Sequence, residues 1–154
     1  MIERRAKVHE DIKRVKMEQI YSNMRYLQAS AFQIVASCGF GKSTRIPAEM
    51  ARNCGFVKFI IVEPRVFVAR NNAGYVNSEI KVKSKSIVRG VSLDSVKAQP
   101  LKTIIYCTKG KLKQMLELFE RDPRLTDELC LVFLDWHVRD GNYAIVITMA
   151  INLL

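Results

Sequence analysis

The sequence predicts an α/β fold in which helices cover both faces of a parallel sheet. Short apolar runs rich in β-branched residues alternate with segments whose apolar residues recur at helical spacing, which is typical of parallel strands joined by helices. The chain has 154 residues, of which 49% are hydrophobic and 26% charged, so it can bury a core and is too apolar for disorder. We expect one domain over residues 1–154, or an incomplete piece of one.

The same patterns predict the elements in chain order. An N-terminal helix is expected within residues 1–28, because between Lys7 and Gln28 the apolar residues fall on one helical face. Strands are expected at Phe32–Ala36, Val57–Val62, Ser86–Val88, Thr103–Cys107 and Leu129–Leu134. Helices are expected at Lys42–Asn53, Arg65–Ile80 and Gly110–Glu120, and from Gly141 or Asn142 to the end. The polar stretch Gly90–Pro100 is expected to be a loop.

The residues at the strand ends are the first place to look for a site. Ligands of open α/β sheets bind at the carboxyl ends of the strands. Ala36, Glu63, Thr108 and Asp135 each stand at such an end. They should therefore line one edge of the domain.

The segment Ala36-Ser37-Cys38-Gly39-Phe40-Gly41-Lys42-Ser43-Thr44 lies between an expected strand and an expected helix, which is the layout of a phosphate-binding loop. Its two glycines allow the backbone to curl so that successive N–H groups point at phosphate oxygens, and the helix adds its positive N-terminal end. Lys42 would reach the β- and γ-phosphates, and the Ser43 hydroxyl would ligate Mg²⁺. The candidate contacts of ATP, or another NTP, are Cys38, Gly39, Phe40, Gly41, Lys42, Ser43 and Thr44. Ala36 stands where the usual pattern has Gly, and the alternative is an ordinary strand–turn–helix with a surface lysine.

No other part of the sequence indicates secretion, a membrane span or a further metal site. The N-terminus is charged and lacks the apolar core of a signal peptide. The longest apolar run, from Ala144 to Leu154, is too short to span a bilayer and contains Thr148 and Asn152. The four cysteines are scattered, so we interpret them as buried thiols and expect an intracellular, reducing compartment with no membrane partner.

The net charge of +10 is unevenly distributed. Residues 81–113 contain nine Lys or Arg residues and one acidic residue, Asp94, whereas residues 114–154 contain three basic and seven acidic residues. A basic block beside an acidic one indicates a face that binds a polyanion, and the phosphate-binding loop favours nucleic acid as that partner. The alternative is a solvated, lysine-rich surface.

Together, the strand-end segments resemble the first motor domain, which is the ATP-binding domain, of superfamily-2 RNA helicases. The resemblance is to the DEAH-box group and to the helicases of flavivirus-like and potyvirus-like RNA viruses, and it covers about Val8 to the C-terminus. The loop Ala36–Thr44, continued by Arg45-Ile46-Pro47, resembles motif I, and Val62-Glu63-Pro64-Arg65 is similar to motif Ia. Arg89-Gly90 matches an Arg-Gly pair of the viral members, and Tyr106-Cys107-Thr108-Lys109-Gly110 resembles motif Ib.

The resemblance implies a RecA-like P-loop NTPase domain that binds single-stranded RNA along its strand ends. The residues that it assigns to the RNA backbone are Pro64, Arg65, Arg89, Gly90, Thr108, Lys109 and Gly110. Singly, Pro-Arg and Thr-x-Gly are more often plain turns or helix starts. Their order and spacing carry the resemblance.

Motif II departs from the family pattern. The family has Asp-Glu-x-His after an apolar strand, whereas this chain has Asp135-Trp136-His137, one residue fewer. If the gap follows Asp135, that residue is the Mg²⁺ ligand and the catalytic Glu is missing, which is the alignment that we prefer. If His137 is held in register instead, Asp135 takes the Glu position and Leu134 replaces the metal ligand. The resemblance assigns catalytic roles to Lys42, Asp135 and His137, while a simple strand-to-helix turn is the alternative for the last two.

Two function classes therefore remain. The first is the NTP-binding core of a superfamily-2 RNA helicase whose hydrolysis is weak in isolation. Its Ser-Ala-Thr motif and second motor domain are absent from the sequence, so that domain, or the rest of a larger polypeptide, is an expected partner. The second is a non-catalytic RNA-binding or interaction module that keeps the P-loop fold. A small P-loop kinase is a weaker third class, because no acceptor-site or lid pattern is present.

Inserting a Glu between Asp135 and Trp136 tests the preferred alignment. The insertion restores the Asp-Glu-x-His spacing and supplies a carboxylate to orient and deprotonate water, so NTP hydrolysis should rise above a very slow, RNA-independent wild-type rate. The measurement is phosphate release with and without RNA. Brisk RNA-stimulated turnover by the unmodified chain that Asp135→Ala abolishes would show that the alignment is wrong.

Overall fold

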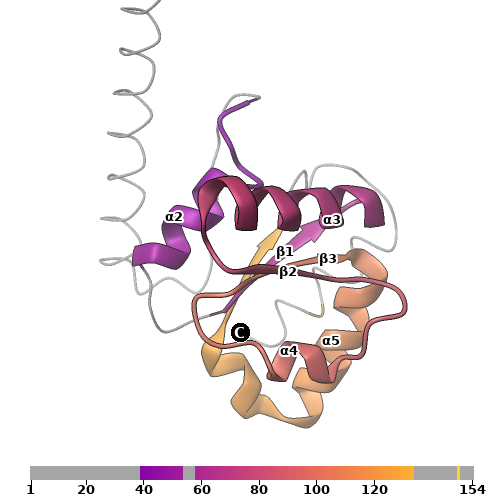
Figure 1. Cartoon of the computed structure of the whole chain (residues 1–154). Helices are drawn as coiled ribbons and strands as arrows, with labels where there is room; N and C mark the ends of the chain where they lie inside the picture. Colours follow the sequence, from indigo (N-terminus) through magenta and orange to yellow (C-terminus); the bar gives the residue numbers. More distant parts are fainter. Residues whose placement is uncertain (1–38, 54–57, 134–148, 150–154) are drawn as a thin grey trace, which may run out of the picture. The chain divides into compact units, whose positions relative to one another are not determined.

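A computed structural model describes residues 39–53 and 58–133 together with Met149 (Figure 1). By its contacts, the chain divides into two compact units, Met1–Gly41 and Lys42–Leu154. Of the first unit, only Gly39, Phe40 and Gly41 are described. The N-terminal helix of residues 1–28, the strand Phe32–Ala36 and the helix from Gly141 onward, of which only Met149 is described, lie outside the described residues. The prediction of a single domain stays a prediction.

The second unit contains a four-stranded parallel sheet. Its strands are β1 (Lys58–Glu63), β2 (Ser84–Ile87), β3 (Ile104–Thr108) and β4 (Leu129–Phe133), in the order β2-β3-β1-β4. Each neighbouring pair is parallel. The sequence placed all four strands within two residues of their observed ends, and β1, β3 and β4 are each largely apolar or β-branched runs, whereas β2 is Ser-Lys-Ser-Ile.

Helices join these strands, as the sequence predicts. They are α2 (Arg45–Asn53), α3 (Val66–Tyr75), α4 (Asp94–Lys97) and α5 (Lys109–Arg121). The end of the expected Arg65–Ile80 helix is a π-helical turn, η1 (Val76–Ile80), and a 3₁₀ helix, η2 (Pro123–Glu128), precedes β4.

The expectation that Gly90–Pro100 is only a loop was wrong, because α4 lies inside it. This four-residue helix has one buried side chain, that of Val96, which packs in the core. Before it, the Ser92 hydroxyl accepts a hydrogen bond from the Asp94 N–H at 3.2 Å. A single apolar residue gives no helical periodicity, so a turn this short leaves no recognisable sequence pattern.

The helices form layers on the two faces of the sheet, as Figure 1 shows for the second unit. On one face, alternate strand residues such as Val62 and Cys107 pack with Leu112, Met115 and Leu116 of α5 and with Val96 of α4. On the other face, α2 and α3 contact β1 and β3. The α/β architecture with a parallel sheet between helices is thus confirmed in the described part of the chain.

The packing of α5 gives a stability test. Leu116 is fully buried between α5 and the sheet, so Leu116→Ala should lower the free energy of unfolding by about 2–5 kcal/mol. The matched control is Glu117→Ala, one residue along the helix on its exposed side, which should change stability by less than about 0.5 kcal/mol. Urea unfolding measures both, and equal losses would contradict the described packing.

Candidate phosphate-binding edge of the sheet

The carboxyl ends of the strands meet at one edge, as the sequence predicts for Glu63 and Thr108. These two residues are direct register partners, at the last positions of β1 and β3. Parallel pairing places both chain reversals at the same edge. The other two expected strand ends, Ala36 and Asp135, lie outside the described residues.

The seven residues assigned to RNA follow three adjacent strands at this edge. Arg89 and Gly90 come two and three residues after β2, Thr108 ends β3 and is followed by Lys109 and Gly110, and Pro64 and Arg65 follow β1. The exposed residues among them are Pro64, Arg65, Arg89, Gly90 and Gly110, while Thr108 and Lys109 are half-buried. We call these seven residues the carboxyl edge. Adjacent strands lie about 4.8 Å apart, so three segments distant in sequence form one short row.

Two helix N-termini open onto the carboxyl edge. Arg65 precedes α3 and Thr108 precedes α5, both with extended backbones (φ −136°, ψ 145° and φ −94°, ψ 162°). Neither residue caps its helix with a side-chain hydrogen bond, and neither first turn contains an acidic residue. The first N–H groups of a helix carry partial positive charge that anions neutralise. The edge therefore combines basic side chains with two N-termini suited to phosphate.

Both glycines of the candidate nucleotide loop adopt backbone angles that favour glycine. Gly39 and Gly41 both have left-handed φ angles, +78° and +86°. No atom lies within 4 Å of a Cβ built at Gly39, so the positive φ rather than crowding is what requires glycine there. Cys38, the first residue predicted to contact nucleotide, lies outside the described residues.

The part of the loop in the second unit is a turn that leads into α2. Lys42, Ser43 and Thr44 form this turn, and all three are half-buried. The helix begins at Arg45, three residues later than predicted, and the Thr44 carbonyl accepts its first hydrogen bond, from the Ala48 N–H at 3.1 Å. Lys42 and Ser43 therefore stand just before the helix N-terminus, where a phosphate would meet them.

Tyr106 connects this turn to the sheet. From the middle of β3, its hydroxyl donates a 2.6 Å hydrogen bond to the Ser43 carbonyl. Burial raises the pKa of the Tyr106 phenol above its ordinary value of 10.0, and the negative charge of Glu63 raises it further. The phenol therefore keeps its proton and remains a donor. Sequence reasoning missed this role, and the one available signal was a hydroxyl-bearing side chain inside an otherwise apolar strand.

Glu63 is a buried carboxylate at the end of β1, with 3% of its surface exposed. The Asn72 side-chain amide, on α3, donates a 2.7 Å hydrogen bond to Glu63 Oε1. Burial, with a smaller contribution from Glu63, raises the pKa of the neighbouring Cys107 thiol to about 12, so that thiol stays protonated. Glu63 thus fixes α3 against the strand end that carries Pro64 and Arg65.

Phe67 is a second residue that sequence reasoning missed. It lies in the first turn of α3, two residues after Arg65, and 71% of its surface is exposed. Proteins that bind single strands combine basic grooves with aromatic side chains on which bases stack. The sequence signal was an aromatic residue two positions after the Pro-Arg pair, where we considered only contacts to the RNA backbone.

Asp135 and His137, the candidate metal ligand and its motif partner, lie outside the described residues. Within the described ranges, no group of three or more His, Cys, Asp or Glu residues could hold a metal ion. The same part of the chain contains no helix long and apolar enough to cross a membrane.

No family model matches the chain, and no curated protein matches its sequence. The function proposed below therefore depends on the motifs and on where the fold places them.

The Tyr106–Ser43 contact can be tested by Tyr106→Phe. The substitution leaves a partly buried carbonyl without its donor, so it should lower the free energy of unfolding by about 1 kcal/mol. Tyr75→Phe, at a tyrosine with 45% of its surface exposed, is the matched control and should be nearly neutral. Urea unfolding at pH 7 gives the comparison.

The fall in the free energy of unfolding at alkaline pH gives an independent test of the burial of Tyr106. Because the folded-state pKa of Tyr106 lies above 10.0, its contribution is fully present below that pH and is lost as pH rises above it. Tyr106→Phe should therefore make the alkaline loss of stability shallower. An unchanged pH profile would mean that the phenol is not buried as described.

Proposed function

We propose that this chain is the NTP-binding core of a superfamily-2 RNA helicase, with a RecA-like P-loop fold. It binds Mg²⁺-NTP at Gly39–Thr44 and single-stranded RNA along the carboxyl edge. The observation that carries the proposal is the row of three adjacent strand ends, β2, β3 and β1, onto which the segments similar to the family motifs converge. Three of the motif-like segments lie there, and the strand before the nucleotide loop and the Asp135-Trp136-His137 segment lie outside the described residues.

The nucleotide half of the proposal rests on the loop. Backbone N–H groups beside Gly39 and Gly41 would hold phosphate oxygens, and Lys42 would neutralise charge on the β- and γ-phosphates. The Ser43 hydroxyl and the Asp135 carboxylate are the oxygen donors that Mg²⁺ prefers. The ion supplies charge neutralisation of the phosphates when it is bound.

The RNA half rests on the chemistry of the carboxyl edge. Arg65 and Arg89 are exposed cations, and the N-termini of α3 and α5 add backbone donors. These groups recognise phosphate, so base preference should be small. Phe67 would add a stacking surface that accepts any base.

Strand β3 contributes residues to both the proposed nucleotide site and the proposed RNA site. Tyr106 holds the Ser43 carbonyl, and two residues later Thr108 ends the strand in the carboxyl edge. Residues two apart in a strand lie on the same face. A shift of the nucleotide loop would therefore be transmitted to the RNA edge along a single strand, which is a physical basis for coupling the two ligands.

Hydrolysis is expected to be weak in the isolated chain. Under the preferred alignment, Asp135 keeps the metal while no carboxylate follows it to activate water. That departure favours the second candidate function, a non-catalytic RNA-binding module that retains the fold. The two candidates share both binding activities and differ in turnover.

Nucleotide binding is tested with Lys42→Ala. Removing the cation should weaken binding of a fluorescent ATP analogue in Mg²⁺ by about tenfold or more, because a hydrogen bond to a charged group contributes about 1.5–3 kcal/mol. The control is Lys81→Ala, which removes the same charge from an exposed residue that follows η1. Equal affinity of wild type and Lys42→Ala would contradict the proposal.

A further inference from the structure

The basic block of residues 81–113 does not form one surface in the fold. Four of its cations follow the carboxyl ends of strands: Arg89 after β2, and Lys109, Lys111 and Lys113 after β3. The other five are Lys81, Lys83, Lys85, Lys97 and Lys102. We call these five residues the amino-end patch, since they lie around the amino ends of three adjacent strands.

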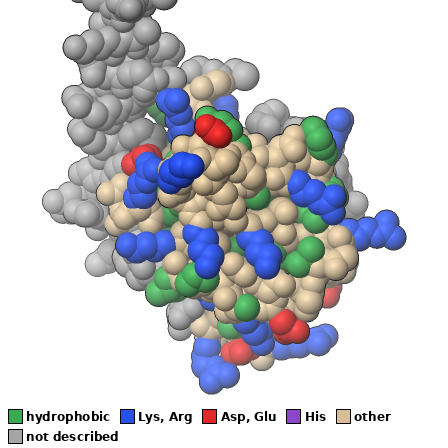
Figure 2. All heavy atoms as spheres, in the orientation of Figure 1, with side chains coloured by type: hydrophobic (Ala, Val, Ile, Leu, Met, Phe, Trp, Pro, Cys, Tyr) green, Lys and Arg blue, Asp and Glu red, His purple; other side chains and the backbone are tan. Residues whose placement is uncertain are grey.

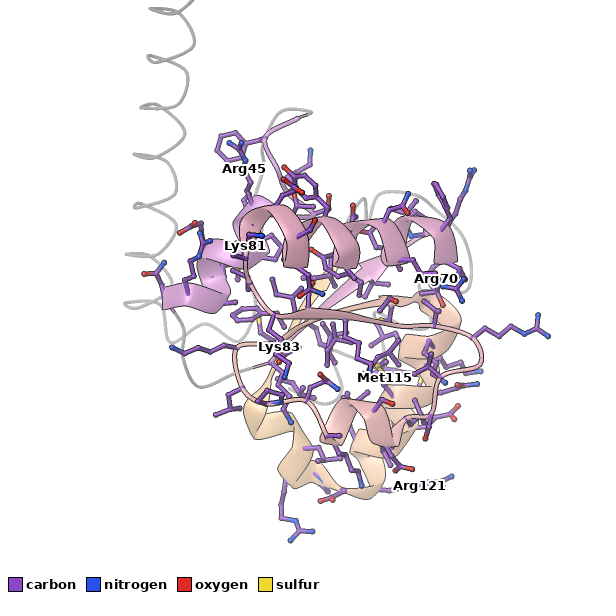
Figure 3. All side chains as sticks on the ribbon, viewed as in Figure 1. Arg45, Arg70, Lys81, Lys83, Met115 and Arg121 are labelled. Carbon is purple, nitrogen blue, oxygen red and sulfur yellow. The ribbon has the colours of Figure 1, made fainter. Side chains whose placement is uncertain are left out.

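Backbone contacts place the patch. The Ile104 N–H, at the start of β3, donates a 2.9 Å hydrogen bond to the Lys83 carbonyl, so Lys83 lies beside the segment that contains Lys102. Lys58 is the first residue of β1, and its ammonium donates to the Lys97 carbonyl at 3.5 Å. The patch therefore extends across the amino ends of β2, β3 and β1. Figure 3 shows Lys81 and Lys83 toward one end of this unit and Arg70 toward the other.

The patch is exposed and basic. All five lysines are exposed, and within the described part of the chain none of them forms an ion pair. The acidic residues nearest in sequence are Glu79 and Asp94, and the Asp94 carboxylate accepts a hydrogen bond from Ser92. Figure 2 shows Lys and Arg side chains spread over this view of the molecule, with fewer acidic side chains among them. The patch thus carries uncompensated positive charge.

Lys85 lies in β2, an edge strand of the described sheet, and Lys83 comes directly before that strand. Ser84, between them, points the other way, because its hydroxyl donates to the Ala73 carbonyl of α3. Ile87 continues the same row as the two lysines and is buried in the core with Val96. The buried end of the row fixes the strand orientation, so both ammonium groups are held on one face.

We propose that the amino-end patch is a second surface for the phosphate backbone of RNA, separate from the carboxyl edge. It shares the RNA partner of the proposed function but rests on different residues. From Ile104 to Thr108 the rise of about 3.3 Å per residue along β3 separates the two surfaces by about 13 Å. That exceeds the Debye length of about 8 Å at physiological salt, so the two surfaces act independently. Lysine ammonium groups contact phosphates as point charges, which suits a strand bound without base readout.

Another explanation exists for lysines on or beside an edge strand such as β2. Charged side chains there prevent other chains from adding a strand to the sheet. That role predicts self-association when the charge is removed and no change in RNA affinity. RNA length separates the two explanations, because only a strand long enough to reach both surfaces can engage both.

The experiment uses the full chain and two oligouridylates, one of about 3 nucleotides, which is too short to reach both surfaces, and one of about 20 nucleotides, which is longer than typical single-strand sites. The patch variant is Lys83→Gln with Lys85→Gln. The edge variant is Arg65→Gln with Arg89→Gln, and the charge-matched control is Arg121→Gln with Arg124→Gln, two exposed arginines outside both surfaces. Affinity is measured against salt concentration, and circular dichroism and sedimentation check fold and self-association.

The slope of log K against log salt is negative. For the longer RNA, the patch variant should make this slope shallower by about 1.4, at about 0.7 per lost phosphate contact. It should leave the shorter RNA unchanged, and its effect should add to that of the edge variant. An unchanged slope, an equal change in the control, or self-association alone would overturn the proposal. Unchanged short-RNA binding by the edge variant is the separate outcome that would refute the carboxyl edge, since that binding does not depend on the patch.

Discussion

Parallel pairing of β3 with β1 is the constraint on which the rest of the described structure depends. The register aligns Glu63 with Thr108, and the pairings of β2 and β4 add one strand on each side. Parallel strands require a crossover from one end of the sheet to the other, so every strand ends at one edge and begins at the opposite edge. The helices that make these crossovers cover the faces and start near the strand ends. One pairing geometry thus fixes the position of the carboxyl edge and the direction of α3 and α5.

The buried polar groups near this edge attach a turn and a helix to the strands. The Tyr106 hydroxyl donates a hydrogen bond to the Ser43 carbonyl, and the Glu63 carboxylate accepts one from the Asn72 side chain of α3. Buried polar groups are tolerated when they are hydrogen-bonded, and a missing partner costs more than the bond contributes. Each contact therefore specifies one position for the segment that it holds. The result is that the turn before α2 is attached to β3 and that α3 is attached to the end of β1.

The fold also separates charge that the sequence presents as one run. Consecutive crossovers send basic residues alternately to the two ends of the sheet, so the cations after β2 and β3 lie at the carboxyl edge and those before these strands lie in the amino-end patch. Along the chain, Lys85 and Arg89 are close, yet they stand in the first half of β2 and beyond its end. A basic block in an α/β sequence is therefore not evidence of a single basic face. Its distribution over the two ends depends on where the strands begin.

The sequence by itself determined the strands, the long helices and the edge at which the motif-like segments gather. Those features depend on local apolar spacing and on the rule that parallel strands end together, both of which can be evaluated without knowing any partner. Tertiary structure alone decided the strand order, the short helix α4, the hydrogen bond from Tyr106 to Ser43, the burial of Glu63 and the exposure of Phe67. Each of these depends on which residues distant in sequence become neighbours. Local spacing carries no information about that choice, because the same alternation of apolar residues is compatible with several strand orders.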